Sequence, residues 1–478
     1  MVAATAGCTG ISTAAHPVVP RSGSTLVATW VDPTGDGILS AGAGERMLRR
    51  VALAPASRAT SVLASFVQLT DTHVTDEESP ARVEMLDRFG APYTSAFRPQ
   101  EALTPQVLAA MLSTINADRP QAVFETGDLI DNDQQNEFTQ AFAVLRGGMV
   151  DPNSGGPGYA GVQAASNPDP LIYRPAVDAP RYPHLLSEAE RPFRSPGLRA
   201  PWYPLPGNHD MLVQGNLRAT ALTQAIVTGG RKLVSIDHAA LVAVERRRLN
   251  PKLIGSLLRR GLPGHWIRVP RDPRRHELSP AQAVAALRRA SAHGGSGRLM
   301  DSTVELGRRV EAILLDTVDR QGGAAGILRS SQVGWLRARL RAAAARWVVV
   351  FSSTPLDQTR GGAQALSLLD GDPRVVAAIA GDVHRNSIRP RRTRAGGYWL
   401  ITTASLIDYP QQARAFRLVA TADGGVVLQT WMLNADPRWR LANISRELAY
   451  LDYQGGRPRH LAGRRGDRNA ELFKRAPG

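Results

Sequence analysis

Seven short apolar runs, rich in β-branched residues, recur along this chain, and most of them end in polar residues. Each run is typical of a buried strand, and helical patterns separate several of the runs. The runs span residues 64–73, 121–131, 202–210, 310–319, 346–355, 375–384 and 398–406, and the helical patterns span residues 104–117, 136–147 and 330–345. Alternating strands and helices favour parallel pairing with right-handed crossovers. The pattern therefore predicts an α/β fold.

Other segments depart from this alternation. Residues 415–433 hold two alternating runs around Asp-Gly-Gly, which predicts an antiparallel hairpin that closes a sheet. Two insertions interrupt the pattern: a Pro-, Gly- and Ser-rich surface loop at about 150–200, and an Arg-rich segment at about 229–300 with a helix at 279–292. We expect a largely irregular arm over residues 1–60, with a strand near 24–31. We expect one large domain over 61–435, and a C-terminal extension over 436–478 whose basic tail is disordered.

The composition excludes several classes of protein. The 478 residues, of which 43% are hydrophobic, suffice for a large core, but no run of about 18 apolar residues could span a membrane. Cys8 is the only cysteine, which excludes an internal disulfide and a thiolate-rich metal site. The first residues lack the charged start and apolar stretch of a signal peptide. We expect a cytoplasmic protein as the sequence stands, or an exported one if the true N-terminus is longer.

The net charge of +16 raises the alternative of a nucleic-acid partner. The basic residues are almost all arginines, and they cluster in residues 245–277 and 455–478. Neither segment alternates arginine with aromatic residues that could stack on bases. We therefore favour solvated, arginine-rich surface over a nucleic-acid interface.

The polar residues at the strand ends form a set of candidate metal ligands. They are Asp71 and His73, Asp128, Asn208 and His209, and Asp382 and His384. In open α/β sheets ligands bind beyond the carboxyl ends of the strands, so these side chains are expected to converge. Oxygen and nitrogen ligands suit Mn, Fe, Zn or Mg. Asp-x-His on an extended segment places both side chains on one side, and a lone carboxylate such as Asp128 could bridge two ions about 3.5–4 Å apart.

Four motifs, "DTH", "GDLID", "GNHD" and "GDVH", follow one another in this order at the strand ends. This order resembles the calcineurin-like metallophosphoesterase superfamily, whose signature is D-x-H, G-D, G-N-H-D/E, a lone His and G-H-x-H. The resemblance covers roughly residues 62–410. It implies a four-layer α/β/β/α sandwich with surface insertions. It also implies hydrolysis of a phosphodiester or phosphomonoester by a water that one or two divalent metal ions activate.

The resemblance assigns a role to each motif residue. Asp71, His73 and His384 would hold the first metal ion, Asp128 would bridge, and Asn208 would bind the second ion together with Asp382. His209 would lie beside the leaving group and protonate it, and Asp210 would orient the His209 imidazole.

The chain departs from the superfamily pattern at two positions that belong to the second metal ion. Ser353 stands where the superfamily has its lone histidine, and Asp382 stands where it has the first histidine of G-H-x-H. A carboxylate is a competent hard ligand, whereas a neutral hydroxyl is a much weaker one. The alternative function is therefore a degenerate protein of this fold, with an impaired second metal site, that acts as a binding protein.

The roles of several nearby residues stay open at this point. Asp131 follows Asp128 at a turn, where it either caps the next helix or supports a metal ligand. Asp316 lies near the end of the run 310–319, and for it we favour a role in a structural turn over a role in the site. Tyr409 and Gln411 either line the cleft or belong to a connection.

Overall fold

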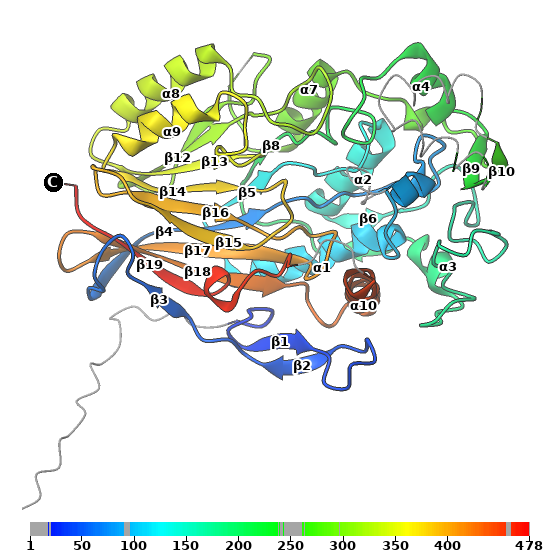
Figure 1. Ribbon diagram of the computed structural model, residues 1–478, viewed down its shortest axis with the longest axis horizontal. Helices are drawn as coiled ribbons and strands as arrows, with labels where there is room; N and C mark the ends of the chain where they lie inside the picture. Colours follow the sequence, from blue (N-terminus) through cyan, green and yellow to red (C-terminus); the bar gives the residue numbers. More distant parts are fainter. Residues whose placement is uncertain are drawn as a thin grey trace, which may run out of the picture.

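Two β-sheets that pack face to face form the centre of the protein in a computed structural model (Figure 1). The structure describes residues 18, 21–89, 96–237, 239, 242, 261, 263–295, 297–455 and 460–477. Cys8 and most of the arginine-rich segment 245–262 lie outside the described residues. In the described part of the chain, no helix is long and apolar enough to cross a membrane.

The first sheet has seven strands. Their order is β3 (Leu48–Arg50), β19 (Ala470–Lys474), β18 (Val426–Asn434), β17 (Gln412–Thr421), β4 (Ala59–Leu69), β5 (Ala122–Thr126) and β8 (Trp202–Leu205). Strands β4, β5 and β8 run parallel, so their carboxyl ends share one edge, whereas β17 pairs antiparallel with both β4 and β18. The predicted hairpin over residues 415–433 is confirmed as β17 and β18.

The second sheet has six strands. Their order is β11 (Ser302–Glu305), β12 (Val310–Leu315), β13 (Trp347–Ser352), β14 (Val375–Ala380), β16 (Tyr398–Thr402) and β15 (Ser387–Arg391). The four central strands run parallel and are almost wholly buried, which explains their nearly continuous apolar sequences. The outer strands β11 and β15 pair antiparallel.

Aromatic side chains join the two sheets. Phe351 of β13 stacks on Phe124 of β5, with ring centroids 4.1 Å apart, and meets Phe66 of β4 edge-on at 5.7 Å. Phe416 of β17 stacks on Phe66 from within the first sheet, at 5.0 Å. Because each such pair contributes about 0.5–1.5 kcal/mol beyond its buried area, this cluster fixes how the sheets, and the loops at their ends, sit on one another.

Helices cover the two outer faces. Helices α8 (Ser330–Ala342) and α9 (Gly362–Asp370) pack on the second sheet through Leu336, Leu340 and Leu366. On the far side of the first sheet, α1 (Thr104–Asp118) packs against β18, α2 (Gln135–Arg146) and α10 (Arg440–Gln454). The result is the four-layer α/β/β/α sandwich that the resemblance implies, and Figure 1 shows α8 and α9 as its outer layer.

The insertions form the end of the molecule where α3, α4, β9 and β10 lie (Figure 1). Their elements are β6 (Gly148–Val150) paired with β7 (Phe193–Ser195), α3 (Leu185–Ala189), α4 (Ala221–Val227), β9 (Arg231–Ile236) paired with β10 (Gly264–Arg268), and α7 (Pro280–Ala290). Short 3-10 turns span Glu84–Phe89, Glu101–Leu103, Pro273–Arg275 and Arg465–Asp467. Residues 150–200 contain little regular structure, as expected, yet they bury Val162 and Ile172 in one apolar cluster with Leu103 and with Leu448 of α10. This segment is therefore packed against the domain.

The chain termini differ from expectation. Strand β1 (Ala28–Val31) confirms the strand expected near 24–31 and pairs with β2 (Ser40–Ala43). Strand β19 pairs with β18 and β3, so the expectation of a disordered basic tail is wrong for residues 470–474. Arg414, fully buried, donates to the carbonyl oxygens of Asp467 and Arg468. The basic composition of the tail suggested solvation, but its apolar residues Leu472 and Phe473 are buried.

Candidate metal centre

The loops that follow the central strands bend sharply at the candidate ligands. Asp71, His73, Asp128, Asp382 and His384 all have positive φ, between 48° and 68°. Side chains other than glycine rarely adopt this left-handed conformation, which costs about 1–3 kcal/mol per residue and concentrates at functional sites. The expectation that the Asp-x-His segments are extended is therefore wrong. Their left-handed turns bring alternate side chains to the same place.

Two glycines let these loops approach one another. A Cβ atom on Gly207 would lie 2.0 Å from Asp128 Oδ1, and one on Gly381 would lie 1.9 Å from Thr70 Oγ1 and 2.8 Å from Asp71 Oδ2. No side chain fits at either position without a shift of the backbone. The Gly in "GNHD" thus lets the loops after β8 and β5 of the first sheet pack closely, and the Gly in "GDVH" lets the loop after β14 of the second sheet pack on the end of β4.

Three of the predicted ligands converge. One ligand atom each from Asp71, His73 and His384 lies within 4.8 Å of the others. His384 Nε2 is 3.3 Å from Asp71 Oδ1, and the rings of His73 and His384 are 5.3 Å apart. The side chain of Asp71 also accepts a hydrogen bond from the Thr70 hydroxyl at 2.7 Å. These are the residues that the sequence analysis assigned to the first metal ion.

Asp131 fixes the orientation of His73. Its Oδ1 lies 3.0 Å from His73 Nδ1, and its other oxygen accepts from the buried guanidinium of Arg82. Burial opposes ionisation of Asp131, but Arg82 and the neighbouring imidazoles lower its pKa, so it accepts from His73 Nδ1–H. His73 Nε2 is then left with a lone pair, and this buried atom has no hydrogen-bond partner among the described residues.

Asp408 plays the same part for His384. Its Oδ2 lies 2.5 Å from His384 Nδ1, and its Oδ1 accepts from Arg98 Nε at 2.6 Å. Burial opposes protonation of His384, but the carboxylates of Asp71 and Asp408 outweigh it and raise the pKa of His384 to about 10. A carboxylate on Nδ1, with Nε2 directed at another candidate ligand, here Asp71 at 3.3 Å, is the arrangement that metal-binding histidines show in proteins.

Asp128 and Asp382 add two carboxylates beside this group. Asp128 Oδ2 is 3.9 Å from His73 Nε2, and the Asp382 amide donates to both oxygens of Asp71 at 3.1 Å. Burial and the Asp71 charge raise the pKa of Asp382 to about 7. Burial, followed by Asp71, Asp210 and Asp382, also raises the pKa of Asp128 well above its usual range. Several carboxylates crowded into one buried place favour a cation.

The part of the site that contains Ser353, where the superfamily pattern has a histidine, is well packed. Asn208 is 9% exposed and donates through Nδ2 to the Gly215 carbonyl at 3.0 Å, which leaves its side-chain oxygen available. Ser353 is buried, and its hydroxyl shares a 2.8 Å hydrogen bond with Thr317. Ser353 thus faces another hydroxyl, and a metal ion there would have to draw on Asp128, Asn208 and Asp382.

His209 sits beside the group, but Asp210 does not orient it. His209 Nδ1 faces the Asp131 carbonyl at 2.6 Å, and its backbone amide donates to Asp128 at 2.8 Å. The Asp210 carboxylate instead accepts from the amides of Gly207, Asp128 and Ile130, at 2.8 to 3.1 Å. The expected contact between Asp210 and the imidazole is therefore wrong. Asp210 thus joins the turn after β5 to the turn after β8 by accepting hydrogen bonds from backbone amides of both turns.

The residues that hold the imidazoles were only partly foreseen. Of the two possibilities for Asp131, the structure shows the contact with a candidate ligand, His73, whereas Asp316 is structural and binds the Met300 amide and Arg320. Asp408, Arg82 and Arg98 were missed. The sequence signal for Asp408 is its position in "SLIDYP", shortly after the last core strand and directly before Tyr409.

Tyr409 and Gln411 belong to a connection. The Tyr409 ring packs against Tyr450 and Tyr453, and Gln411 donates to Ile407 O and Ser445 Oγ. Both residues therefore anchor the loop that carries Asp408 to helix α10.

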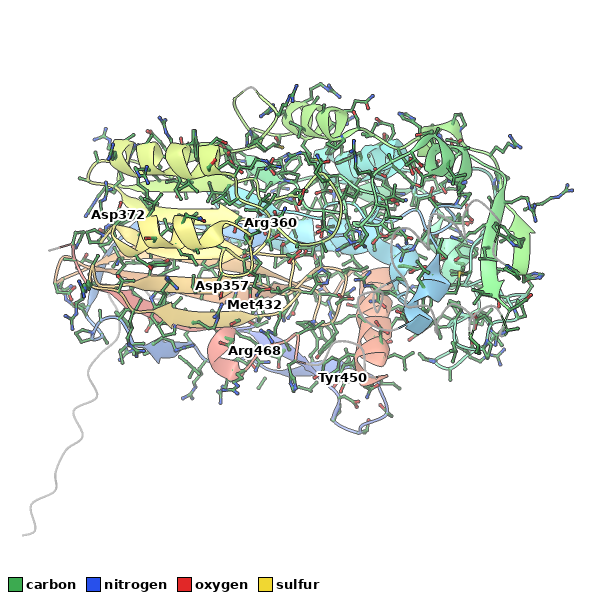
Figure 2. The ribbon with its side chains drawn as sticks, turned by 45° about the horizontal axis from the view of Figure 1, so that its top comes forward. Asp357, Arg360, Asp372, Met432, Tyr450 and Arg468 are labelled. Carbon is green, nitrogen blue, oxygen red and sulfur yellow. The ribbon has the colours of Figure 1, made fainter. Side chains whose placement is uncertain are left out.

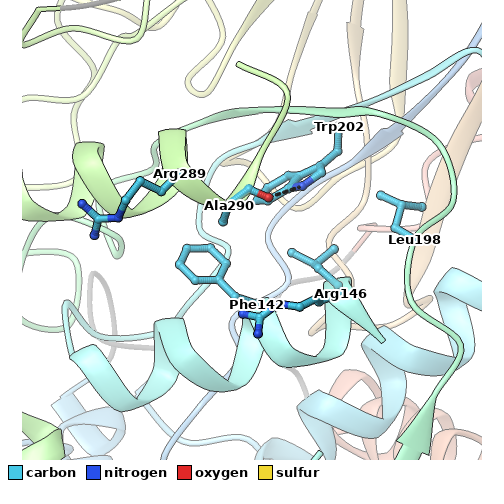
Figure 3. A pocket seen from close by; sticks show the side chains of 7 residues that line it. Phe142, Arg146, Leu198, Trp202, Arg289 and Ala290 are labelled. Atoms are coloured by element: carbon cyan, nitrogen blue, oxygen red, sulfur yellow. Dashed lines mark hydrogen bonds between the residues drawn. The ribbon is translucent and has the colours of Figure 1, made fainter. Parts of the chain in front are cut away.

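A separate cavity of about 500 Å³ lies at the opposite end of β8 (Figure 3). Trp202, at the start of the strand, forms part of its wall and donates to the Ala290 carbonyl at 3.0 Å. Phe142, Arg146 and Arg289 also line it. The candidate ligands follow the end of β8, so this cavity is distinct from the metal centre.

Comparison with known proteins gives distant similarities. The chain matches no family model and no curated protein. Solved structures similar to it include a dimetal phosphatase from Danio rerio, with 12% identity and a TM-score of 0.39, over 78% of this chain and 99% of that one. They also include the sulfate thiohydrolase SoxB from Thermus thermophilus in complex with glycerol, with 10% identity and a TM-score of 0.30, over 83% of this chain and 61% of that one.

The roles of Asp131 and Asp408 lead to a prediction about metal affinity. Asp131→Asn and Asp408→Asn should each weaken binding of Mn²⁺ or Zn²⁺ about 10- to 100-fold, because the imidazole loses the charge that fixes Nδ1–H and makes Nε2 basic. Titration against a chelating dye measures the affinity. Asp316→Asn is the matched control: it is equally buried but binds no imidazole, and its metal affinity should equal that of the wild type. Unchanged affinity in both test variants would contradict the assignment.

Proposed function

We propose that the protein is a metal-dependent phosphoesterase that hydrolyses a phosphodiester or phosphomonoester, with a preference for diesters. The observation that carries the proposal is the pair of imidazoles, His73 and His384, each fixed at Nδ1 by a buried carboxylate and each directing Nε2 toward the Asp71 carboxylate. A buried nitrogen acceptor without a partner, as His73 Nε2 is, fits a divalent cation. The resemblance in motif order supports the same reaction class.

The donor set suits two divalent cations of the Mn, Fe, Zn or Mg type. Asp71, His73 and His384 would hold one cation, Asp128 would bridge, and Asn208 with Asp382 would hold the other. When bound, such cations neutralise phosphate oxygens and lower the pKa of a coordinated water. The choice among the four metals follows from no feature of the described residues, because all four accept carboxylate and imidazole ligands.

His209 is the group best placed to handle the proton of the leaving alcohol. Its Nδ1–H is directed to the Asp131 carbonyl, so Nε2 is the atom that faces outward, and the side chain keeps 22% exposure. Burial, and the nearby His73, lower the pKa of His209 to about 3. An anionic ester beside Nε2 raises that pKa by charge attraction and so favours the protonated, donating form.

A direct assay tests the proposed function. The purified chain, incubated with Mn²⁺, Fe²⁺, Zn²⁺ or Mg²⁺, should hydrolyse bis-p-nitrophenyl phosphate faster than p-nitrophenyl phosphate, with about two metal ions bound per chain. Release of p-nitrophenol gives the rate, and elemental analysis gives the metal content. Removal of metal by a chelator should abolish turnover, and readdition should restore it. A chain without turnover under every metal condition would refute the proposal.

His209→Ala should lower kcat about 10²- to 10⁴-fold and leave the metal content unchanged, because the variant loses proton transfer and keeps every proposed ligand. The loss should be larger for an alkyl ester than for a p-nitrophenyl ester, since the alkoxide is the poorer leaving group. His265→Ala, an exposed histidine of β10, is the control. Complete loss of metal in His209→Ala would show that this side chain is a ligand.

A second candidate function is a degenerate binding protein that holds one metal ion. The observation that favours it is the buried hydrogen bond between Ser353 and Thr317, at the place where the superfamily pattern has a histidine. Such a protein would bind a phosphate ester without hydrolysing it.

Ser353→His separates the two functions. If the missing ligand limits the second metal ion, this variant should bind that ion more tightly and turn over faster, as metal titration and the diester assay measure. Ser353→Ala is the matched control, because it breaks the bond to Thr317 without adding a ligand, and it should gain neither. Two metal ions and full turnover already present in the wild type would exclude the degenerate protein.

A further inference from the structure

A second polar cavity, of about 200 Å³, lies where the N-terminal arm meets helix α10 and the start of β17. Its lining includes Trp30 of β1, Tyr409, Gln412, Arg446 of α10 and Arg468. None of the candidate metal ligands lines it. The three segments that form it are far apart in the sequence, and two of them belong to the arm and the extension outside residues 61–435.

Arg446 is the unusual residue of this cavity. It is only 1% exposed, and its guanidinium carbon lies 4.3 Å from the centre of the Trp30 ring. Its two terminal nitrogens donate to Asn443 Oδ1 at 3.2 Å and to the Ala435 carbonyl at 3.3 Å, while Nε has no hydrogen-bond partner in the described part of the chain. No carboxylate among the described residues forms an ion pair with it. Burial accordingly lowers the pKa of Arg446 to about 10.

The contacts present do not balance this buried charge. The Trp30 ring and two neutral acceptors contact the guanidinium, but none of them supplies the negative charge that a buried cation normally has beside it. The neighbouring arginine is different, since Arg468 forms an ion pair with Glu45 at 2.6 Å. The cavity therefore carries a guanidinium that forms no ion pair with a carboxylate of the described residues, and Glu447 attracts it only from a longer range.

The rest of the wall is suited to a polar organic molecule. Among the described residues, Arg468 Nε is a buried donor without a hydrogen-bond partner, whereas Glu45 Oε2 and Gln412 Oε1 are buried acceptors without one, which suit a donor group of a ligand and not its charged oxygens. Tyr409 adds an aromatic ring, which packs on Tyr450 of α10. Figure 2 shows where Tyr450 and Arg468 lie. About seven water molecules would fill such a volume, which is the size of a small ring with one charged substituent.

We propose that this cavity binds a small organic oxyanion, a carboxylate or a phosphate monoester, whose charged group pairs with Arg446 and whose apolar part lies against Tyr409. The guanidinium is the group that recognises planar and tetrahedral oxyanions through paired N–H donors. Because Tyr409 follows Asp408, the partner of His384, the ligand would lie behind the loop that orients one candidate metal ligand. The proposal stands independently of the proposed function.

Calorimetric titration of the full chain tests this proposal. The protein is first stripped of metal with a chelator, so that oxyanions do not bind at the metal centre. Benzoate and phenyl phosphate distinguish a carboxylate from a phosphate-ester ligand, inorganic phosphate tests the need for a ring, and neutral benzyl alcohol tests the need for charge. We expect one site per chain for benzoate or phenyl phosphate and none for benzyl alcohol. No binding of any anion, or equal binding of benzyl alcohol, would overturn the proposal.

Two sets of variants locate the site. Arg446→Met should weaken binding about tenfold or more, because a charge-assisted hydrogen bond contributes about 1.5–3 kcal/mol. Arg440→Met, on the same helix but largely exposed, should bind as the wild type does. Because Trp30 stacks on Arg446, binding of an anion there should change the tryptophan fluorescence of the wild type. Trp30→Phe, on the hairpin outside the two sheets, should still bind the anion but should show no such change in fluorescence. Unchanged affinity in folded Arg446→Met, or an unchanged fluorescence response in Trp30→Phe, would refute the assignment. If Arg446→Met does not fold, the Trp30→Phe result decides.

Discussion

The two carboxylate–imidazole pairs are the interactions on which the candidate site depends. Asp131 and Asp408 each hold an Nδ1–H and thereby decide which way Nε2 points. Each carboxylate is in turn held by a buried arginine, and Glu101 joins the two arginines because it accepts from the Arg82 side chain at 2.7 Å and from the Arg98 amide at 3.0 Å. The two imidazoles come from different sheets, so one connected set of charges aligns the two sheet edges at the place where the ligands must meet.

This network has consequences for stability as well as for geometry. Buried ion pairs gain little over apolar packing, but removing one partner leaves an uncompensated charge at a cost of about 3–5 kcal/mol. Lys232 of the insertion extends the network, since its fully buried ammonium lies 2.8 Å from Glu84, which itself lies 3.8 Å from Arg82. The insertion is therefore coupled to the site through charges. The buried charges are compensated by one another, which makes each member of the network depend on the others.

Much of the fold followed from sequence because hydrophobic burial is local in its signature. All seven predicted runs became strands, since each carries enough apolar area to need two covered faces. The same reasoning did not predict strand β19. Its buried residues Leu472 and Phe473 form only a short apolar run, and the many arginines of the tail made the segment resemble solvated chain. For the site, motif spacing identified Asp71, His73 and His384 because short turns after strands place ligands reproducibly. Asp408 and Arg98 could not be predicted, because each has its partner far away in the sequence. Asp408 binds His384 and Arg98 binds Asp408, and only the tertiary fold brings these residues together.

The weaker half of the site has a physical explanation in the same contacts. Ser353 is not an exposed vacancy, because its hydroxyl bonds to Thr317 and its carbonyl accepts from the Gly381 amide at 2.9 Å. Gly127 lies so close that a Cβ there would be 2.9 Å from Ser353 Cβ. The serine is therefore a packed residue of the interior, and a histidine at this position would lose the hydrogen bond to Thr317. Asp382, by contrast, brings a negative charge to a group that already holds Asp71 and Asp128, and this extra carboxylate compensates in charge for the imidazole that the chain lacks. A second cation at this place would thus be held by charge more than by the number of ligands, and all four of the metals named above accept carboxylate ligands.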